Sequence, residues 1–307
     1  MTIPDYQSLI DAETWAFIRQ TDAEYPPDAI SLTIQQQRDI YDRMCRRFHA
    51  GYPEGVTAVD ETISGVPCRR YPGTGPVVLY FHGGGFVVGG LHSHDDVCAE
   101  IRAATGMTVI SVDYRLCPEH IHPAAYDDCL AVAQSVDGPI ILAGDSAGGN
   151  LAASVSGRMR DSGKILGQVL IYPGLGGDRN AGSYVTHANA PMLTTADVKY
   201  YWAIRHGGKE PSGADPTSNA LDDTDFSRLP PTLAIAAECD PLADDPHVYA
   251  AKIRSAGGLA HAVTEPGLVH GYLRARHTVG RARESFDRIT ATISAFAAGQ
   301  WPFGEEP

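Results

Sequence analysis

The chain has 307 residues, of which 43% are hydrophobic and 20% charged, an ordinary balance for a globular protein with a sizeable core. Its formal net charge of −13, with no basic stripe to offset it, argues against nucleic acid and against an anionic membrane surface as partners. The 6 cysteines form no CxxC pair, and the chain shows neither a signal peptide nor an apolar run of the ~18 residues that a membrane span needs, so we expect a cytoplasmic protein.

The first part of the chain has the apolar spacing of helices over residues 11–20 and 31–48. Two short extended stretches at 56–63 and 66–72 then predict a hairpin. From residue 77 onward, short β-branched runs alternate with longer helical segments. The expected strands cover 77–82, 107–114, 139–144, 168–173, 232–238 and 261–265, and the expected helices cover roughly 94–104, 123–136, 147–161, 244–256 and 280–298.

This alternation predicts an α/β fold with a mostly parallel central sheet flanked by helices, because parallel strands need crossover connections and lie buried. The stretch 174–228 is rich in Gly, Asp, Asn and Ser and interrupts the alternation, with one helix expected near 195–206. We expect residues 51–307 to form the main domain, with 174–228 inserted over one end of the sheet. Residues 1–50 are expected to add a helical cap segment there.

Residues 144–150 read GDSAGGN and place Ser146 between an apolar strand and a helix. The pattern Gly144-x-Ser146-x-Gly148 is typical of a nucleophile elbow, a strained turn that holds a serine oxygen above the carboxyl end of a sheet. The helix that follows would also direct its free N–H groups toward the serine. An ordinary turn with an incidental serine is the alternative, and the flanking strand and helix favour the nucleophile.

A second glycine cluster, HGGGF at residues 82–86, also follows a strand. It fits neither the GxGxxG nor the GxxxxGK phosphate-binding pattern, and a merely flexible turn would not explain its place at a strand end. Bare backbone N–H groups in such a loop could stabilise the oxyanion of a tetrahedral intermediate. We expect Gly83, Gly84 and Ala147 to donate those hydrogen bonds, and His82 to anchor the loop.

A serine nucleophile needs a base, and the base needs an acid that orients it. Asp240 follows the expected strand 232–238, and His270 follows the expected strand 261–265, which is the chain order serine, acid, histidine of this kind of fold. Position therefore favours Asp240 as the acid and His270 as the base. The other candidates are less well placed in the expected elements: Glu238, Asp244, Asp245, His261 and His277.

Two histidine-rich stretches, HSHDD at 92–96 and HIH at 120–122, raise the alternative of a metal site. A zinc site needs three or four converging ligands, and neither stretch supplies a third histidine at useful spacing. We therefore expect these histidines in loops and helix caps, and we expect no metal and no cofactor.

These motifs together resemble the hormone-sensitive-lipase-like carboxylesterases, the bacterial family IV esterases of the α/β-hydrolase fold. The resemblance covers about 75–300 and rests on HGGGF, VDYRLCPEH at 112–120, PAAYDD at 123–128, GDSAGGN, DPLADD at 240–245 and HGY at 270–272. It implies a serine carboxylesterase that cleaves short- to medium-chain acyl esters through an acyl-enzyme, with a cap made from N-terminal helices. The residues it implies are the triad Ser146, Asp240 and His270 and the oxyanion hole Gly83, Gly84 and Ala147.

The resemblance leaves several alternatives open. The same triad could act on lactones, amides or acetylated sugars, since fold alone does not determine the substrate. Some proteins of this fold are small-molecule receptors without catalysis, but these lack a working histidine, whereas His270 is present here. Relatives often form homodimers, and no feature of this sequence tests that possibility.

Overall fold

The computed structural model describes residues 4–26, 31–209 and 213–304. The strands are β1 (Val59–Ile63), β2 (Val66–Tyr71), β3 (Val77–Phe81), β4 (Thr108–Val112), β5 (Ile140–Asp145), β6 (Ile165–Ile171), β7 (Thr232–Cys239) and β8 (Ala260–Val269). The α-helices are α1 (Tyr6–Leu9), α2 (Ala12–Asp22), α3 (Ile34–Phe48), α4 (Asp95–Thr105), α5 (Ala124–Ser135), α6 (Ala147–Arg158), α7 (Gly182–Thr186), α8 (Thr195–Arg205), α9 (Asp244–Ser255) and α10 (Gly280–Ala297). Short 3₁₀ turns lie at η2 (Ala220–Asp222) and η3 (Tyr272–Ala275).

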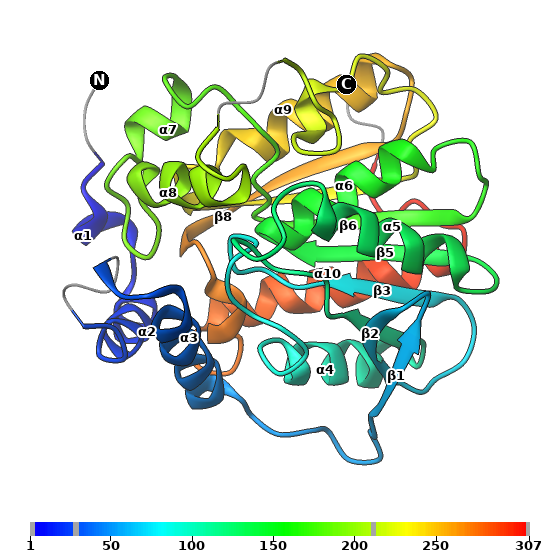
Figure 1. Ribbon diagram of the computed structural model, residues 1–307, viewed down its shortest axis with the longest axis horizontal. Coiled ribbons are helices and arrows are strands. Elements are labelled where there is room, and N and C mark those ends of the chain that lie inside the picture. Colours follow the sequence, from blue (N-terminus) through cyan, green and yellow to red (C-terminus); the bar gives the residue numbers. More distant parts are fainter. Residues whose placement is uncertain (1–3, 27–30, 210–212, 305–307) are drawn as a thin grey trace.

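One 8-stranded sheet runs through the middle of the molecule in the order β1-β2-β4-β3-β5-β6-β7-β8, with helices on both faces (Figure 1). The strands from β4 to β8 in this order pair in parallel, whereas β2 pairs antiparallel with both β1 and β4. The predicted α/β fold with a mostly parallel sheet is therefore confirmed, and so is the predicted hairpin.

The core forms two apolar layers, one on each face of the sheet. Helices α3, α5, α6 and α9 contribute to one layer, and α2, α4 and α10 contribute to the other. The central strands β4 and β5 are buried at every position, because a parallel strand between two helical layers has no solvent face. This burial explains why the central strands are visible in the sequence as unbroken apolar runs.

Strand β8 continues beyond its predicted end at residue 265 and reaches Val269. It includes Pro266 and Gly267, and its pairing with β7 shifts register between Ala237 and Cys239. The N–H of Gly267 donates to a Glu238 carboxylate oxygen at 2.6 Å instead of to a strand carbonyl. The longer strand delivers the next residue, His270, directly to the carboxyl end of the sheet.

The N-terminal helices and the segment around α8 lie together at one end of the sheet (Figure 1). The Gln37 amide on α3 donates to the Tyr200 hydroxyl on α8 at 2.9 Å, which joins the two segments directly. Side chains of α2, α3 and α8 also line one common cavity. These contacts are those expected of two segments that form a joint cover.

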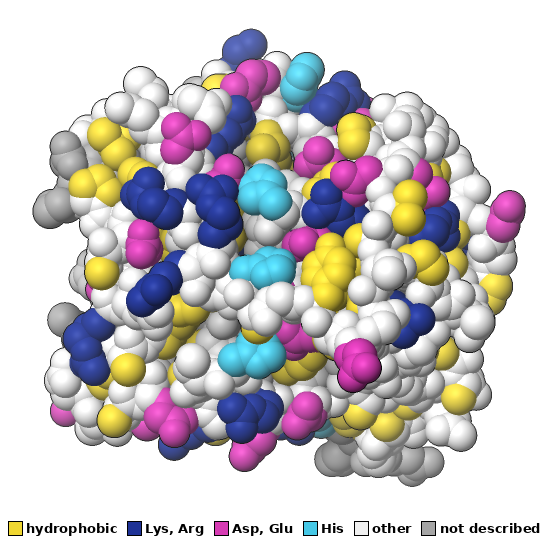
Figure 2. All heavy atoms as spheres, turned by 90° about the horizontal axis from the view of Figure 1, so that it is seen from below, with side chains coloured by type: hydrophobic (Ala, Val, Ile, Leu, Met, Phe, Trp, Pro, Cys, Tyr) yellow, Lys and Arg dark blue, Asp and Glu magenta, His cyan; other side chains and the backbone are white. Residues whose placement is uncertain are grey.

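The surface seen in Figure 2 places basic side chains next to acidic ones. Among the ion pairs of the described residues, the Arg38 guanidinium lies 2.7 Å from the Glu119 carboxylate. In the described part of the chain, no helix has both the length and the apolar character that crossing a membrane requires.

Candidate active site

Ser146 occupies the turn between β5 and α6 in a strained backbone conformation. Its φ of 54° and ψ of −116° are rare for a residue with a side chain, and such strain costs on the order of 1–3 kcal/mol. The turn is held in part by the Ser146 N–H, which donates to the Ile171 carbonyl at 2.9 Å. This is the local geometry that the nucleophile-elbow pattern predicts.

The glycines on either side of Ser146 stand where the chain passes too close for a side chain. A Cβ on Gly148 would lie 1.8 Å from the Phe81 carbonyl oxygen at the end of β3. A Cβ on Gly144 would lie 2.5 Å from the backbone carbonyl carbon of Gly148. The small residues around the serine therefore allow β3, β5 and α6 to meet beneath it.

The structure brings Ser146, His270 and Asp240 together from three separate elements. His270 Nε2 lies 2.8 Å from the Ser146 Oγ, and His270 Nδ1 lies 2.7 Å from an Asp240 carboxylate oxygen. The Asp240 side chain is fully buried, and its other oxygen accepts a hydrogen bond from the Leu242 N–H at 2.9 Å. With a proton on Nδ1 directed to Asp240, Nε2 can accept the serine proton.

The glycine loop after β3 departs from the sequence prediction at Gly83. The Gly83 N–H donates to an Asp145 carboxylate oxygen at 2.9 Å, so it is not free to bind a substrate oxygen. Gly84 and Gly85, in contrast, line the cavity beside Ser146. Both have positive φ, and a Cβ on Gly85 would lie 2.7 Å from the Tyr201 ring. The candidate oxyanion donors are therefore Gly84, Gly85 and Ala147, and the expectation for Gly83 is wrong.

Asp145 is a site residue that the sequence reasoning missed. Its buried carboxylate accepts hydrogen bonds from the Tyr80 hydroxyl at 2.8 Å and the Gly83 N–H at 2.9 Å, and it lies 3.2 Å from His94 Nε2. Burial alone would raise the pKa of Asp145. The charge and hydrogen bond of His94, the charge of Arg274 and the Tyr80 hydroxyl hold that pKa well below its usual range. The sequence signal that could have identified Asp145 is an acidic residue at the end of an otherwise apolar strand.

His82 anchors the glycine loop, as predicted. Its Nδ1 lies 2.8 Å from the Gly83 carbonyl oxygen, and its ring stacks on the Tyr114 ring at 4.2 Å. The Tyr114 hydroxyl donates to the His82 carbonyl at 2.6 Å. Because burial lowers the pKa of His82 to about 3, the ring is neutral at pH 7.

The other acids considered from the sequence have structural partners. Glu238 lies within β7 as expected, and Asp244 and Asp245 begin α9. Asp245 also stabilises the loop after β6, since one of its carboxylate oxygens accepts hydrogen bonds from consecutive backbone N–H groups of that loop. These donors belong to Leu175 at 2.6 Å, Gly176 at 3.1 Å and Gly177 at 3.3 Å.

Three of the histidines considered as metal ligands pair with one acid each; His94 pairs with Asp145 as described above. His92 pairs with Asp42 at 2.6 Å, and His122 pairs with Asp215 at 3.0 Å. Within residues 4–26, 31–209 and 213–304, no three His, Cys, Asp or Glu side chains are grouped so that they could hold a metal ion.

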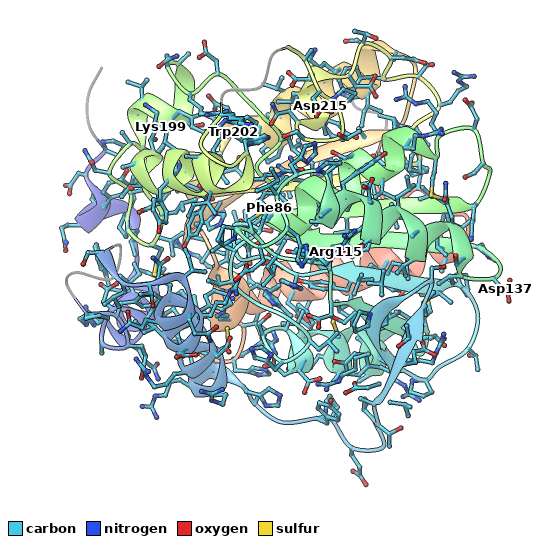
Figure 3. The ribbon with its side chains drawn as sticks, viewed as in Figure 1. Phe86, Arg115, Asp137, Lys199, Trp202 and Asp215 are labelled. Carbon is cyan, nitrogen blue, oxygen red and sulfur yellow. The ribbon has the colours of Figure 1, made fainter. Side chains whose placement is uncertain are left out.

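Two cavities meet at Ser146. The larger, of about 320 Å³, has His270, Gly271 and Arg274 in its wall. The smaller, of about 90 Å³, has Ala147 in its wall, together with Phe86 near the centre of the molecule and Trp202 on α8 (Figure 3). Residues that line both cavities separate them: Gly85, Leu193 and Tyr201. The serine can thus be reached from two sides.

Comparison with known proteins finds a family model, described as alpha/beta hydrolase fold, that matches residues 78–274. Carboxylesterase NlhH of Mycobacterium tuberculosis is 37% identical over 95% of this chain and 92% of its own length. Esterase LipI of the same organism is 38% identical over 69% of this chain and 70% of its own. The structure of a hyperthermophilic esterase from the archaeon Pyrobaculum calidifontis superposes with a TM-score of 0.83 at 32% identity, covering 94% of this chain and 99% of that one.

Proposed function

Because the chain belongs to the hormone-sensitive-lipase-like family of α/β hydrolases, we propose that it is a carboxylic ester hydrolase with Ser146 as nucleophile. The observation that carries this proposal is the continuous hydrogen-bonded chain from Asp240 through His270 to Ser146. The names of its esterase relatives support the same reaction class.

In the first half of the reaction, the Ser146 Oγ attacks the ester carbonyl carbon while His270 Nε2 takes its proton. Asp240 holds the histidine in the tautomer that leaves Nε2 unprotonated, and its negative charge stabilises the imidazolium that forms. Burial of Asp240 strengthens this stabilisation, since charges interact more strongly away from water.

The tetrahedral oxyanion is stabilised by the backbone N–H groups of Gly84, Gly85 and Ala147. Ala147 is the first residue of α6, so its N–H has no partner within the helix. One well-placed donor of this kind contributes about 3–4 kcal/mol to transition-state stabilisation. Gly83 supports this set indirectly, because its bond to Asp145 fixes the start of the loop.

In the second half, His270 protonates the leaving alcohol, and an acyl group remains on Ser146. Water then attacks this acyl-enzyme with His270 again as base, which releases the acid and restores the serine. The small size of the cavity beside Ala147, about 90 Å³, supports short- to medium-chain acyl groups.

We infer that the described parts of residues 1–50 and 174–228 cover the site and act as a cap on the catalytic domain 51–307. The hydrogen bond between Gln37 and Tyr200 and the shared cavity lining support this division.

Lactones, amides and acetylated sugars would use the same triad. A receptor without catalysis is disfavoured by the intact contacts of His270.

The direct test is Ser146→Ala, assayed with p-nitrophenyl esters of chain length C2 to C16. We expect turnover to fall by about 10⁴- to 10⁶-fold while the protein stays folded, with the wild type fastest at C2–C8. Ser156→Ala is a matched control on the same helix, since the buried Ser156 hydroxyl has no hydrogen-bond partner to lose. Normal turnover by a folded Ser146→Ala protein would refute the assignment.

A further inference from the structure

Arg274 lies in the wall of the larger cavity with Ser146 and His270. It belongs to the 3₁₀ turn η3, and its Nη2 donates to the Tyr41 hydroxyl on α3. Gly271 directly follows His270, and a Cβ on Gly271 would lie 3.5 Å from the Arg274 Nη1. The Arg274 Nε is buried and has no hydrogen-bond partner. A guanidinium with donors to spare therefore lines the cavity next to the catalytic histidine.

Among the described residues, no carboxylate contacts the Arg274 guanidinium, although Asp145 interacts with its charge from a longer distance. The neighbouring Arg276 shows the usual arrangement for a buried arginine, since it lies 2.6 Å from both Asp96 and Glu100. In the described part of the chain, no Asp or Glu lies within 4.0 Å of the Arg274 guanidinium. Arg205 also lacks an ion pair, but it uses its Nη groups on the Ser218 carbonyl and the Asn150 side chain.

The acids in the same cavity wall do not form an ion pair with Arg274. The Asp145 carboxylate is held by Tyr80, Gly83 and His94. Asp197 accepts from the Thr194 N–H and hydroxyl, 2.9 Å and 2.6 Å away, at the start of α8. The remaining acid, Asp22, is exposed at the end of α2. Asp145 interacts with the charge of Arg274 from further away, but no acid of this wall contacts the guanidinium, so its free donors remain available to a bound anion.

The position of His270 indicates which part of an ester reaches Arg274. In the tetrahedral intermediate, the leaving oxygen must lie within hydrogen-bond reach of His270 Nε2 to receive its proton. His270 and Gly271 line the larger cavity, whereas Ala147 and Phe86 line the smaller one. The alcohol portion therefore occupies the larger cavity, and the acyl portion occupies the smaller.

We propose that Arg274 binds a carboxylate on the alcohol portion of the ester, so that acyl esters of hydroxy acids are a preferred substrate class. The planar guanidinium matches a carboxylate through two parallel hydrogen bonds, and burial strengthens the pair. This inference rests on the proposed ester hydrolysis at Ser146 and adds a specificity to it.

The test compares pairs of esters that differ in charge but have nearly the same shape. For the alcohol side, the pair is 4-acetoxybutanoate and 4-methylpentyl acetate. For the acyl side, the pair is monoethyl succinate and ethyl 4-methylpentanoate. We expect kcat/KM, measured by pH-stat, to favour the anionic member by about 10- to 100-fold in the alcohol-side pair only, as a charge-assisted hydrogen bond predicts.

Three variants separate recognition from structure. Arg274→Met should bring the alcohol-side ratio close to 1. Arg19→Met removes the same charge from an exposed position on α2, outside both cavities, and should keep the ratio. Tyr41→Phe removes the hydrogen bond between Arg274 and α3 but keeps the guanidinium over the ring of residue 41, so it should also keep the ratio.

The outcomes are distinguishable. Hydrolysis of neutral esters without a preference for the alcohol-side anion, or a preference on the acyl side, would overturn the role of Arg274 and leave the esterase assignment intact. Equal loss of the ratio in Arg274→Met and Tyr41→Phe would also overturn it, because the effect would then be structural. Failure to hydrolyse any of the four esters or p-nitrophenyl acetate would overturn the proposed function itself.

Discussion

The substitution Gly148→Ala adds one methyl group where the structure has no room for it. The new Cβ would lie 1.8 Å from the Phe81 carbonyl oxygen, 2.4 Å from its carbon and 2.7 Å from the His82 carbonyl oxygen. All three atoms are backbone, so no side chain can rotate away, and either β3 or α6 must shift. Overpacking of this kind costs about 1–3 kcal/mol, and we expect the upper end of that range.

Two measurements follow from this shift. A cost of about 3 kcal/mol should lower Tm by roughly 6–12 °C, since 1 kcal/mol corresponds to about 2–4 °C in a domain of 150–250 residues. The displaced residues Phe81 and His82 also begin the glycine loop, so the oxyanion donors should move with them. A misplacement near 1 Å costs about 10²-fold in rate, and we expect kcat for p-nitrophenyl acetate to fall by about that factor.

Gly213→Ala is the control for this experiment, because a Cβ there would meet no atom within 4 Å and its backbone is not left-handed. It should leave both Tm and kcat near the wild-type values. If Gly148→Ala also matched the wild type in both, the close approach of β3 and α6 could not be what the glycine provides.

The remaining predictions concern buried polar groups. Asp145→Asn should lower the free energy of unfolding in urea by about 3 kcal/mol, and an unchanged midpoint would contradict this. An asparagine oxygen could still accept from Tyr80 and Gly83, but the amide nitrogen would replace the charged oxygen that faces His94 Nε2. Asp245→Ala should lower Tm by several degrees, since it leaves backbone N–H groups of the loop after β6 without an acceptor. For His82, the folded pKa of about 3 lies below the unfolded value of 6.5, so the unfolded chain binds more protons between these pH values. Stability should therefore fall as the pH is lowered from about 6.5 to about 3, and His82→Gln should show a shallower fall in urea titrations.

Much of the fold could be predicted because the buried central strands have almost entirely apolar sequences. Strands such as β5 are apolar on both faces, and their ends set the positions of Ser146 and Asp240. The end of β8 was harder to predict, since Pro266 and Gly267 normally interrupt a strand. β8 lies at the edge of the sheet, where a residue without an N–H costs no ladder hydrogen bond. The strand can therefore include Pro266 and continue to Val269.

The donors of the glycine loop could be located from the sequence only as a group. Which N–H groups are free depends on Asp145, which lies 62 positions further along the chain and takes the first of them. The spacing of residues within the HGGGF motif gives no indication of that contact. The same limit applies to Arg274, because its lack of a carboxylate partner is a property of its surroundings in the fold.

Two contacts make the nucleophile and its oxyanion donors a single unit. The Asp145 carboxylate, next to Ser146 in the chain, holds the Gly83 N–H, and Gly148 on the other side of the serine packs against the Phe81 carbonyl. The elbow and the glycine loop are therefore joined on both sides of the serine, and neither can move without the other. Since Ser146 and the donors must keep their spacing through the reaction, this coupling explains why the chain places an acid and a glycine at these positions. A serine presented by a passive turn would need neither of them.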